Sequence, residues 1–204
     1  MHSENIITAG NIGNPSKALI LLHGRGARAE DILSLADHLN VKDHLLLAPQ
    51  ATNNSWYPQS FIAPLAQNQP WLESALELVT ATVAAATAKG VAKDHIYFAG
   101  FSQGACLTLE YITRNATKYG GAAVFTGGLI GDRIYSDHYK GDFAQTPVFI
   151  GTGDPDFHVP VERVHDSVTL LKSMGADVTE KIYPGMGHTI NSDEISQANN
   201  LIFK

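Results

Sequence analysis

The sequence predicts an α/β fold built on one mostly parallel sheet with helices on both of its faces. Short apolar runs alternate with longer helical stretches along the whole chain, which is the pattern of repeated strand and helix units. Hydrophobic residues make up 44% of the chain and charged residues 17%, as in soluble globular proteins. A chain of 204 residues is most simply one domain, so we expect residues 1–204 to share a single fold.

The first four elements are predicted from turn formers and apolar periodicity. Residues 5–8 and 17–23 have the composition of strands, and the turn-rich stretch 10–15 between them predicts an edge hairpin. Residues 29–39 place their apolar side chains on one helical face, and residues 44–48 form a short apolar run typical of a buried strand. The chain therefore begins with two strands, a helix and a further strand.

The alternation continues to the end of the chain. The expected strands are residues 95–99, 122–126, 148–151 and 177–183. The expected helices are residues 71–89, 102–117, 160–174 and a closing helix that runs to residue 202. Gly90 and Gly175 end two of these helices, and Asn191 with the acidic residues after it supplies an N-cap for the last.

Two long irregular segments, residues 49–70 and 127–147, each follow an expected strand. In sheets of this kind ligands bind beyond the carboxyl ends of the strands, which is where both segments begin. The sequence leaves open whether residues 127–147 shape a pocket, form a homodimer contact or do neither.

The stretch Gly100-Phe101-Ser102-Gln103-Gly104 stands between an expected strand and an expected helix, with one serine at the corner. A nucleophilic serine needs a tight turn that holds its hydroxyl clear of the sheet, and such a turn requires small neighbours. Gly100 and Gly104 supply that space, and the N–H groups at the start of the helix can stabilise a developing oxyanion. Five residues also match by chance, so the motif requires a base and an acid later in the chain.

His188 is the predicted base. It ends the stretch Tyr183-Pro184-Gly185-Met186-Gly187-His188, whose turn formers lift it into a loop after the last expected strand. The acid is expected in the loop after residues 148–151, which carries two aspartates. Asp154 lies beside a proline close to the strand, where aspartate commonly hydrogen-bonds its own loop backbone. Asp156 lies further out and is the favoured acid.

Backbone donors and aromatic side chains complete the expected site. An early glycine-rich loop carries Arg25, whose backbone N–H forms the predicted oxyanion site together with that of Gln103. This role does not require the charge of Arg25, so the side chain can simply be solvated. Trp56, Tyr57 and Phe61 either form an apolar wall against the substrate or pin their loop to the sheet, and the sequence leaves both interpretations open.

Several classes of ligand are not expected. The net charge of −6 provides no basic surface for nucleic acid. The stretch Gly24-x-Gly26-x-x-Ala29 matches a degenerate dinucleotide fingerprint, but the next strand ends in Ala48-Pro49-Gln50 and lacks the acid that would bind a ribose. No phosphate-binding loop with its lysine, zinc motif or cysteine pair is present, so we expect no cofactor and no metal.

The expected compartment is the cytoplasm. The single Cys106 excludes an internal disulfide, and a buried small hydrophobe is its expected role. The start of the chain lacks the features of a secretory signal, and its apolar runs are too short to span a bilayer. We therefore expect no stable membrane insertion.

Taken in order, these motifs resemble the phospholipase/carboxylesterase family of α/β-hydrolases, which includes the acyl-protein thioesterases. The resemblance runs from about residue 17 to the C-terminus, and it rests on the serine turn, on His23-Gly24, on the loop from Gly153 to Pro160, and on the stretch from Gly185 to His188. It implies an α/β-hydrolase fold, minimal and without a cap domain. It also implies Ser102, Asp156 and His188 as the catalytic residues.

Two stretches depart from the acyl-protein thioesterases. The loop Arg25-Gly26-Ala27-Arg28 stands where family members that act on acylated proteins commonly carry an aspartate. The stretch Ser55-Trp56-Tyr57-Pro58-Gln59-Ser60-Phe61 is more similar to small bacterial carboxylesterases. The expected activity is therefore hydrolysis of small to medium carboxylic esters through an acyl-serine, with a small-molecule ester as substrate.

Other activities remain as alternatives at this stage. The chain could hydrolyse or bind products of aromatic degradation, such as dienelactone-like or quinone-like molecules. It could also act as a thioesterase or lysophospholipase on longer acyl chains. All three catalytic residue types are present with glycines at the turn, which argues against a binding protein that has lost turnover.

Overall fold

The computed structural model describes residues 1–204 and contains one seven-stranded sheet. Its strand order is β1-β3-β2-β4-β5-β6-β7, with only β1 antiparallel to its neighbour. The strands are β1 (Ile6–Gly10), β2 (Lys17–Leu22), β3 (His44–Pro49), β4 (Ile96–Phe101), β5 (Gly121–Phe125), β6 (Pro147–Asp154) and β7 (Asp177–Pro184). The predicted class, a mostly parallel α/β sheet, is confirmed.

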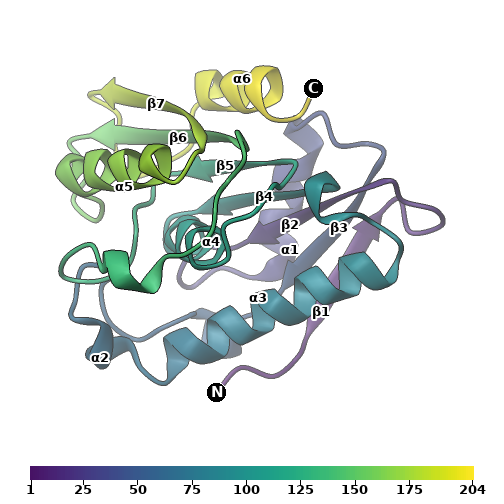
Figure 1. Ribbon diagram of the computed structural model, residues 1–204, viewed down its shortest axis with the longest axis horizontal. Helices are drawn as coiled ribbons and strands as arrows, with labels where there is room; N and C mark the ends of the chain where they lie inside the picture. Colours follow the sequence, from purple (N-terminus) through teal and green to yellow (C-terminus); the bar gives the residue numbers. More distant parts are fainter.

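Helices cover both faces of the sheet, as expected, and Figure 1 shows α3, α4 and α5 together on one side of it. On the other face, α1 and α6 pack against the sheet. The α-helices are α1 (Ala29–Leu33), α2 (Leu65–Asn68), α3 (Trp71–Ala88), α4 (Gln103–Arg114), α5 (Val161–Ser173) and α6 (Ser192–Leu201). The 3-10 helices are η1 (Ser34–His38), η2 (Thr52–Asn54), η3 (Lys93–His95) and η4 (Ser136–His138). No helix has both the length and the apolar composition that a bilayer crossing requires.

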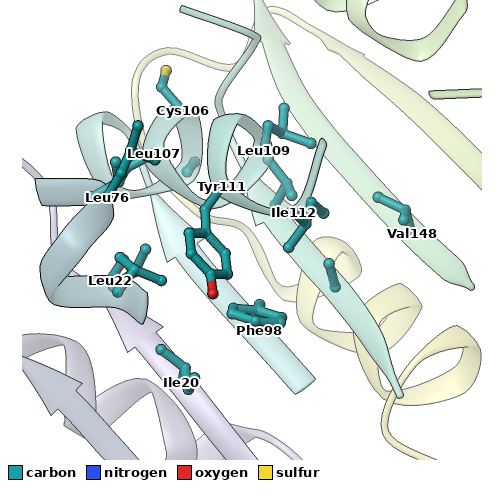
Figure 2. Packing of buried hydrophobic residues seen from close by; sticks show 14 of the residues in the cluster. Ile20, Leu22, Leu76, Phe98, Cys106, Leu107, Leu109, Tyr111, Ile112 and Val148 are labelled. Atoms are coloured by element: carbon teal, nitrogen blue, oxygen red, sulfur yellow. The ribbon is translucent and has the colours of Figure 1, made fainter. Parts of the chain in front are cut away.

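The larger part of the core lies between the sheet and helices α3, α4 and α5. Alternate residues of the central strands point into it, because successive side chains of a strand face opposite sides. Figure 2 shows Leu22 of β2 and Phe98 of β4 facing Leu107 and Tyr111 of α4. The rings of Phe98 and Tyr111 lie 5.9 Å apart. This packing fixes α4, whose first residue follows the corner serine.

The predicted edge hairpin is wrong. β1 is an edge strand, but it pairs with β3, from Ile6 opposite Pro49 to Gly10 opposite Leu45. β2 lies inside the sheet between β3 and β4, and its side chains are buried on both faces from Ala18 onward. Since both edges of β2 are occupied by parallel strands, β1 has no place beside it.

Several local predictions are confirmed. Asn191 caps α6, since its side chain accepts from the Glu194 N–H and its own N–H donates to the Glu194 carboxylate, each at 2.9 Å. Gly90 and Gly175 follow α3 and α5 with φ of +87° and +81°. The helix predicted over residues 29–39 is divided, because α1 ends at Leu33 and a 3-10 turn continues from Ser34.

Candidate active site

Ser102 occupies a sharp turn between β4 and α4, with φ of 55° and ψ of −117°. Non-glycine residues adopt this conformation rarely, at a cost of roughly 1–3 kcal/mol. The two flanking glycines make the turn sterically feasible. A Cβ at Gly100 would lie 2.5 Å from the Gly104 carbonyl oxygen, and a Cβ at Gly104 would collide with the Leu22 carbonyl. Glycine is therefore required at both positions of this motif because the backbone of another residue lies directly against each of them.

The Ser102 hydroxyl, the His188 imidazole and the Asp156 carboxylate form one hydrogen-bonded chain. His188 Nε2 lies 2.7 Å from Ser102 Oγ, and His188 Nδ1 lies 2.8 Å from Asp156 Oδ2. The Asp156 side chain is fully buried, and that of His188 is 25% exposed. The structure thus brings together three side chains that are separated by up to 86 residues in the sequence.

The loop that carries His188 is held against the end of β6. The Gly185 N–H donates to the Asp154 carbonyl at 2.7 Å, and Gly185 itself has a φ of +75°. A Cβ at Gly153 would collide with the Met186 carbonyl, so only glycine permits this approach. The Phe101 ring lies 5.2 Å from the imidazole of His188. Backbone contacts and two aromatic neighbours, Phe101 and His158, therefore fix the position of His188.

Asp156, rather than Asp154, faces the histidine. Its Oδ1 accepts from the backbone N–H groups of His158 and Val159 at 2.7 and 2.9 Å, which leaves Oδ2 for His188. Burial alone would raise the pKa of Asp156, but these three hydrogen bonds outweigh it, and its pKa lies below the usual range. The carboxylate is therefore ionised at neutral pH. Asp154 is exposed, and only its backbone carbonyl is engaged, so the side-chain turn role expected for it is not found.

The backbone N–H groups of Arg25 and Gln103 donate to no atom of the protein. Both residues line the same pocket as Ser102. The loop before Arg25 is held by His23, whose Nδ1 lies 2.8 Å from the Gly24 carbonyl, while Nε2 accepts from the Ala51 N–H at 3.2 Å. Burial lowers the pKa of His23, so this imidazole is neutral and acts as a structural bridge.

The Gln103 side chain has a contact that the sequence did not indicate. Its Oε1 accepts from the Trp56 N–H at 3.0 Å, and its Nε2 donates to the Tyr57 carbonyl at 2.8 Å. Gln103 therefore fastens the segment after β3 directly to the first residue of α4. Asn68 is a second contact of this kind, since its buried amide bonds the backbone of Gln59 and Ser60. No local sequence pattern indicates either role, because Gln103 bonds backbone 46 and 47 residues away and Asn68 bonds backbone 8 and 9 residues away.

The Arg25 side chain is not simply solvated, which corrects the sequence interpretation. Its Nη1 donates to Ser55 Oγ at 2.8 Å and to the Pro58 carbonyl at 3.1 Å, and its Nη2 donates to the Gln59 carbonyl at 2.7 Å. The guanidinium carbon also lies 5.9 Å from the centre of the Tyr57 ring. The side chain is thus exposed yet held in one position.

A pocket of about 630 Å³ opens at Ser102 and His188. Of the three aromatic residues expected in its wall, Tyr57 and Phe61 line it and Trp56 does not. Trp56 is fully buried, and its Nε1 donates to the His23 carbonyl at 2.8 Å. Trp56 therefore pins the loop, whereas Tyr57 and Phe61 remain the predicted residues of an apolar wall. Residues 157–160, in the loop that carries Asp156, also line the pocket.

Cys106 and the remaining titratable groups do not suggest a second reactive centre. Cys106 lines the pocket but is almost fully buried, and burial raises the pKa of its thiol to about 12, so it is not a thiolate. No cluster of three or more histidine, cysteine, aspartate or glutamate side chains could hold a metal ion.

Comparisons with known proteins identify the family of this chain. The family model described as Phospholipase/Carboxylesterase matches residues 4–204. The chain is 28% identical over 195 residues to the probable carboxylesterase SOBER1-like of Arabidopsis thaliana, covering 87% of this chain and 74% of that protein. It is 36% identical over 110 residues to acyl-protein thioesterase 1 of Gibberella zeae, covering 53% of this chain and 47% of that protein.

A solved structure is more similar still. The crystal structure of a phospholipase/carboxylesterase from Dyadobacter fermentans superposes with a TM-score of 0.98 at 59% identity, covering 100% of this chain and 98% of that one. The expected α/β-hydrolase fold is therefore confirmed, and the chain belongs to the phospholipase/carboxylesterase family.

Proposed function

We propose that this protein is a serine carboxylesterase that hydrolyses small to medium carboxylic esters through an acyl-serine intermediate. The observation that supports it most strongly is the hydrogen-bonded chain from Ser102 through His188 to the buried carboxylate of Asp156. A serine hydroxyl is a weak nucleophile at neutral pH, and a positioned imidazole oriented by a carboxylate is the arrangement that activates it.

In the acylation step, Ser102 Oγ attacks the ester carbonyl carbon while His188 Nε2 takes the hydroxyl proton. Asp156 holds the imidazole in the tautomer with its proton on Nδ1, and it stabilises the imidazolium that forms. The oxyanion of the tetrahedral intermediate accepts hydrogen bonds from the N–H groups of Arg25 and Gln103, which have no other acceptor. As the carbon–oxygen bond breaks, His188 returns its proton to the leaving alcohol.

Deacylation repeats these events with water. After the alcohol has left, a water molecule attacks the acyl carbon while His188 Nε2 takes a proton from it. The second tetrahedral intermediate then collapses, the carboxylic acid departs, and the proton returns to Ser102 Oγ. No step requires a metal or an organic cofactor.

The volume of the pocket supports a small substrate. A volume of about 630 Å³ lies within the range that takes a small ligand rather than a macromolecule. Ile62 and Phe157 are the exposed apolar residues of its lining, with smaller contributions from the largely buried Tyr57, Phe61 and Val159, and Ser102 and His188 lie in the same pocket. We therefore assign the acyl or alcohol group of a small ester to these side chains.

The test compares catalytic variants with a matched histidine on the surface. His188→Ala and Asp156→Asn should lower kcat for nitrophenyl acetate by about three orders of magnitude or more, because each removes or misorients the base. His165→Ala, which removes an exposed imidazole bonded to Glu180, should retain the activity of the unmodified protein. Equal activity in all three variants would refute the serine mechanism.

A panel of esters and thioesters with short and long acyl chains tests which class of acyl substrate the protein hydrolyses. The thioesterase name of one relative makes short and long acyl thioesters the relevant comparison. We expect kcat/KM to be highest for esters with short acyl chains. A rise of kcat/KM toward long acyl thioesters would contradict the assignment to small esters while leaving the serine mechanism intact.

A further inference from the structure

The charge of the pocket lining differs from that of the whole protein. The chain has a net charge of −6, with 20 acidic residues. The fifteen residues that line the pocket include no aspartate or glutamate, and Arg25 is their only permanently charged side chain. The lining thus carries one permanent positive charge, while the ionised Asp156 carboxylate lies outside the lining, bonded to His188 and without exposed surface.

The charge of Arg25 has no carboxylate partner. Arg28 and Arg114 each form an ion pair with a glutamate, whereas Arg25 forms none. The acceptors of its three hydrogen bonds are the Ser55 hydroxyl and two backbone carbonyls, which are all neutral. A cation held in place without a counter-ion attracts an anion more strongly than a flexible, hydrated one.

The guanidinium also retains donors. It carries five N–H groups, and the three hydrogen bonds to Ser55, Pro58 and Gln59 leave the Nε–H and one N–H of Nη2 without a partner. Two donors on one guanidinium are what a carboxylate with two acceptor oxygens requires. Pro58, Gln59 and the Tyr57 ring beneath the guanidinium all line the pocket, so the charge lies at the pocket wall.

We propose that Arg25 forms a carboxylate-binding subsite, and that the substrate is an ester that also carries a carboxylate. This inference rests on the proposed function. The backbone N–H of Arg25 is assigned to the oxyanion site, so the same residue would bind the scissile carbonyl through its backbone and the substrate anion through its side chain. The carboxylate must therefore lie only a few bonds from the ester, as in the half-ester of a short dicarboxylic acid.

The experiment measures kcat/KM for two matched pairs of esters by proton release at constant pH. The first pair is monoethyl glutarate and ethyl valerate, which differ by a carboxylate on the acyl side. The second pair is 4-acetoxybenzoate and phenyl acetate, which differ by a carboxylate on the alcohol side. We expect the unmodified protein to prefer the charged member of at least one pair about tenfold or more, as charge-assisted hydrogen bonds in a pocket provide.

Three variants separate recognition of the anion from support of the loop. Arg25→Gln should reduce the charged-to-neutral ratio about tenfold, and Arg25→Lys should restore part of it because the charge returns. Arg28→Gln, in the same loop but paired with Glu30, should leave the ratio unchanged. The ratio is the readout, since a merely structural role of Arg25 would lower both rates together.

Each outcome has a definite meaning. A ratio near one in the unmodified protein for both pairs, or a ratio that Arg25→Gln does not alter, would overturn the carboxylate subsite while leaving the esterase assignment intact. Absence of turnover on all four esters would instead refute the proposed function, and the subsite with it. A preference that weakens between about 20 mM and 500 mM salt would support the electrostatic origin.

Discussion

The two long irregular segments, residues 49–70 and 127–147, begin at similar places in the sheet but differ in whether they line the pocket. Each follows a parallel strand at its carboxyl end, where ligands bind in sheets of this kind. The first segment forms one wall of the pocket, whereas the second contributes no residue to the lining. Position after a strand therefore does not decide whether a loop builds the site.

The anchors of the two segments explain the difference. The first is bonded to the residues around the nucleophile, since Gln103 holds Trp56 and Tyr57 and Arg25 holds Pro58. These bonds keep the segment beside Ser102.

The second segment is bonded to Glu110, in the second half of α4, and to Arg163 of α5. Buried Glu110 of α4 accepts from the Ile130 N–H at 3.1 Å and from the Tyr139 hydroxyl at 2.9 Å. Arg163 of α5 donates to the carbonyls of Leu129 and Gly131. One bond joins the two segments, from the Gly131 N–H to the Phe61 carbonyl at 2.7 Å. Residues 127–147 are thus bonded to the pocket-lining segment at Phe61 without lining the pocket themselves.

The largest expected effect comes from the anchor of the second segment. Glu110→Ala leaves Arg114 without its buried partner and removes the acceptor for Ile130 and Tyr139, so the free energy of unfolding should fall by about 3 kcal/mol. Glu73→Ala removes the exposed partner of the same arginine and should cost less than about 1 kcal/mol. Urea titration measures both, and comparable losses would contradict the role given to Glu110.

The anchor of the first segment should affect catalysis more than stability. Gln103→Ala keeps the backbone N–H assigned to the oxyanion but releases Trp56 and Tyr57, so kcat/KM should fall about 10- to 100-fold from misplacement of the wall. Gln67→Ala, at an exposed position of the same segment, is the control. Steady-state kinetics with thermal melting separates the two effects. A lower melting temperature with unchanged kcat/KM would show that Gln103 only stabilises the fold.

A third anchor holds the end of the loop that carries His188, where the Glu194 carboxylate accepts from the Asn191 N–H. This carboxyl group titrates. Glu194 of α6 is buried with one carboxylate oxygen unpartnered, and burial raises its pKa to about 7. The protonated form is therefore favoured in the folded state. Its stabilising contribution is complete below the pKa of the unfolded chain and is lost as pH rises toward 7, at up to about 1.4 kcal/mol per pH unit.

Glu194→Gln should remove this dependence. Between pH 5 and about 7, the free energy of unfolding should fall less steeply in this variant than in the unmodified protein. Glu162→Gln, in the exposed first turn of α5, is the matched control. Identical slopes in Glu194→Gln and the unmodified protein would show that this carboxyl does not titrate in that range.

The smallest expected effect distinguishes Phe61, which lines the pocket, from Trp56, which does not. Phe61→Leu should change the relative kcat/KM for bulky and small esters about threefold, because Phe61 lines the pocket. Trp56→Phe loses the bond to the His23 carbonyl and should lower the free energy of unfolding by about 1–2 kcal/mol without changing that preference. Competition between two esters measures the ratio. A shift caused by Trp56→Phe would mean that Trp56 reaches the substrate.

The sequence was most informative where structure depends on neighbouring residues. The serine turn was predictable because Gly100 and Gly104 must both be small for one local backbone path. The cap at Asn191 depends on a residue only three positions away. His188 and Asp156 were predictable because each lies in a turn-rich loop after a strand, and such loops meet at the same edge of a parallel sheet.

Features that depend on distant partners were not predictable from the sequence. β1 pairs with β3 because β2 has parallel neighbours on both sides, which no local pattern records. Whether an aromatic faces the pocket depends on partners such as the His23 carbonyl, which is 33 residues from Trp56. The fixed position of the Arg25 side chain likewise depends on acceptors 30 to 34 residues away.

Labelling with a fluorophosphonate, followed by peptide mapping, tests the central claim most directly. The reagent reacts covalently with a serine that an adjacent base has activated. We expect one adduct, on Ser102, that is absent from His188→Ala and present in His165→Ala. An adduct on another serine, or an unlabelled Ser102 in the folded protein, would contradict this claim.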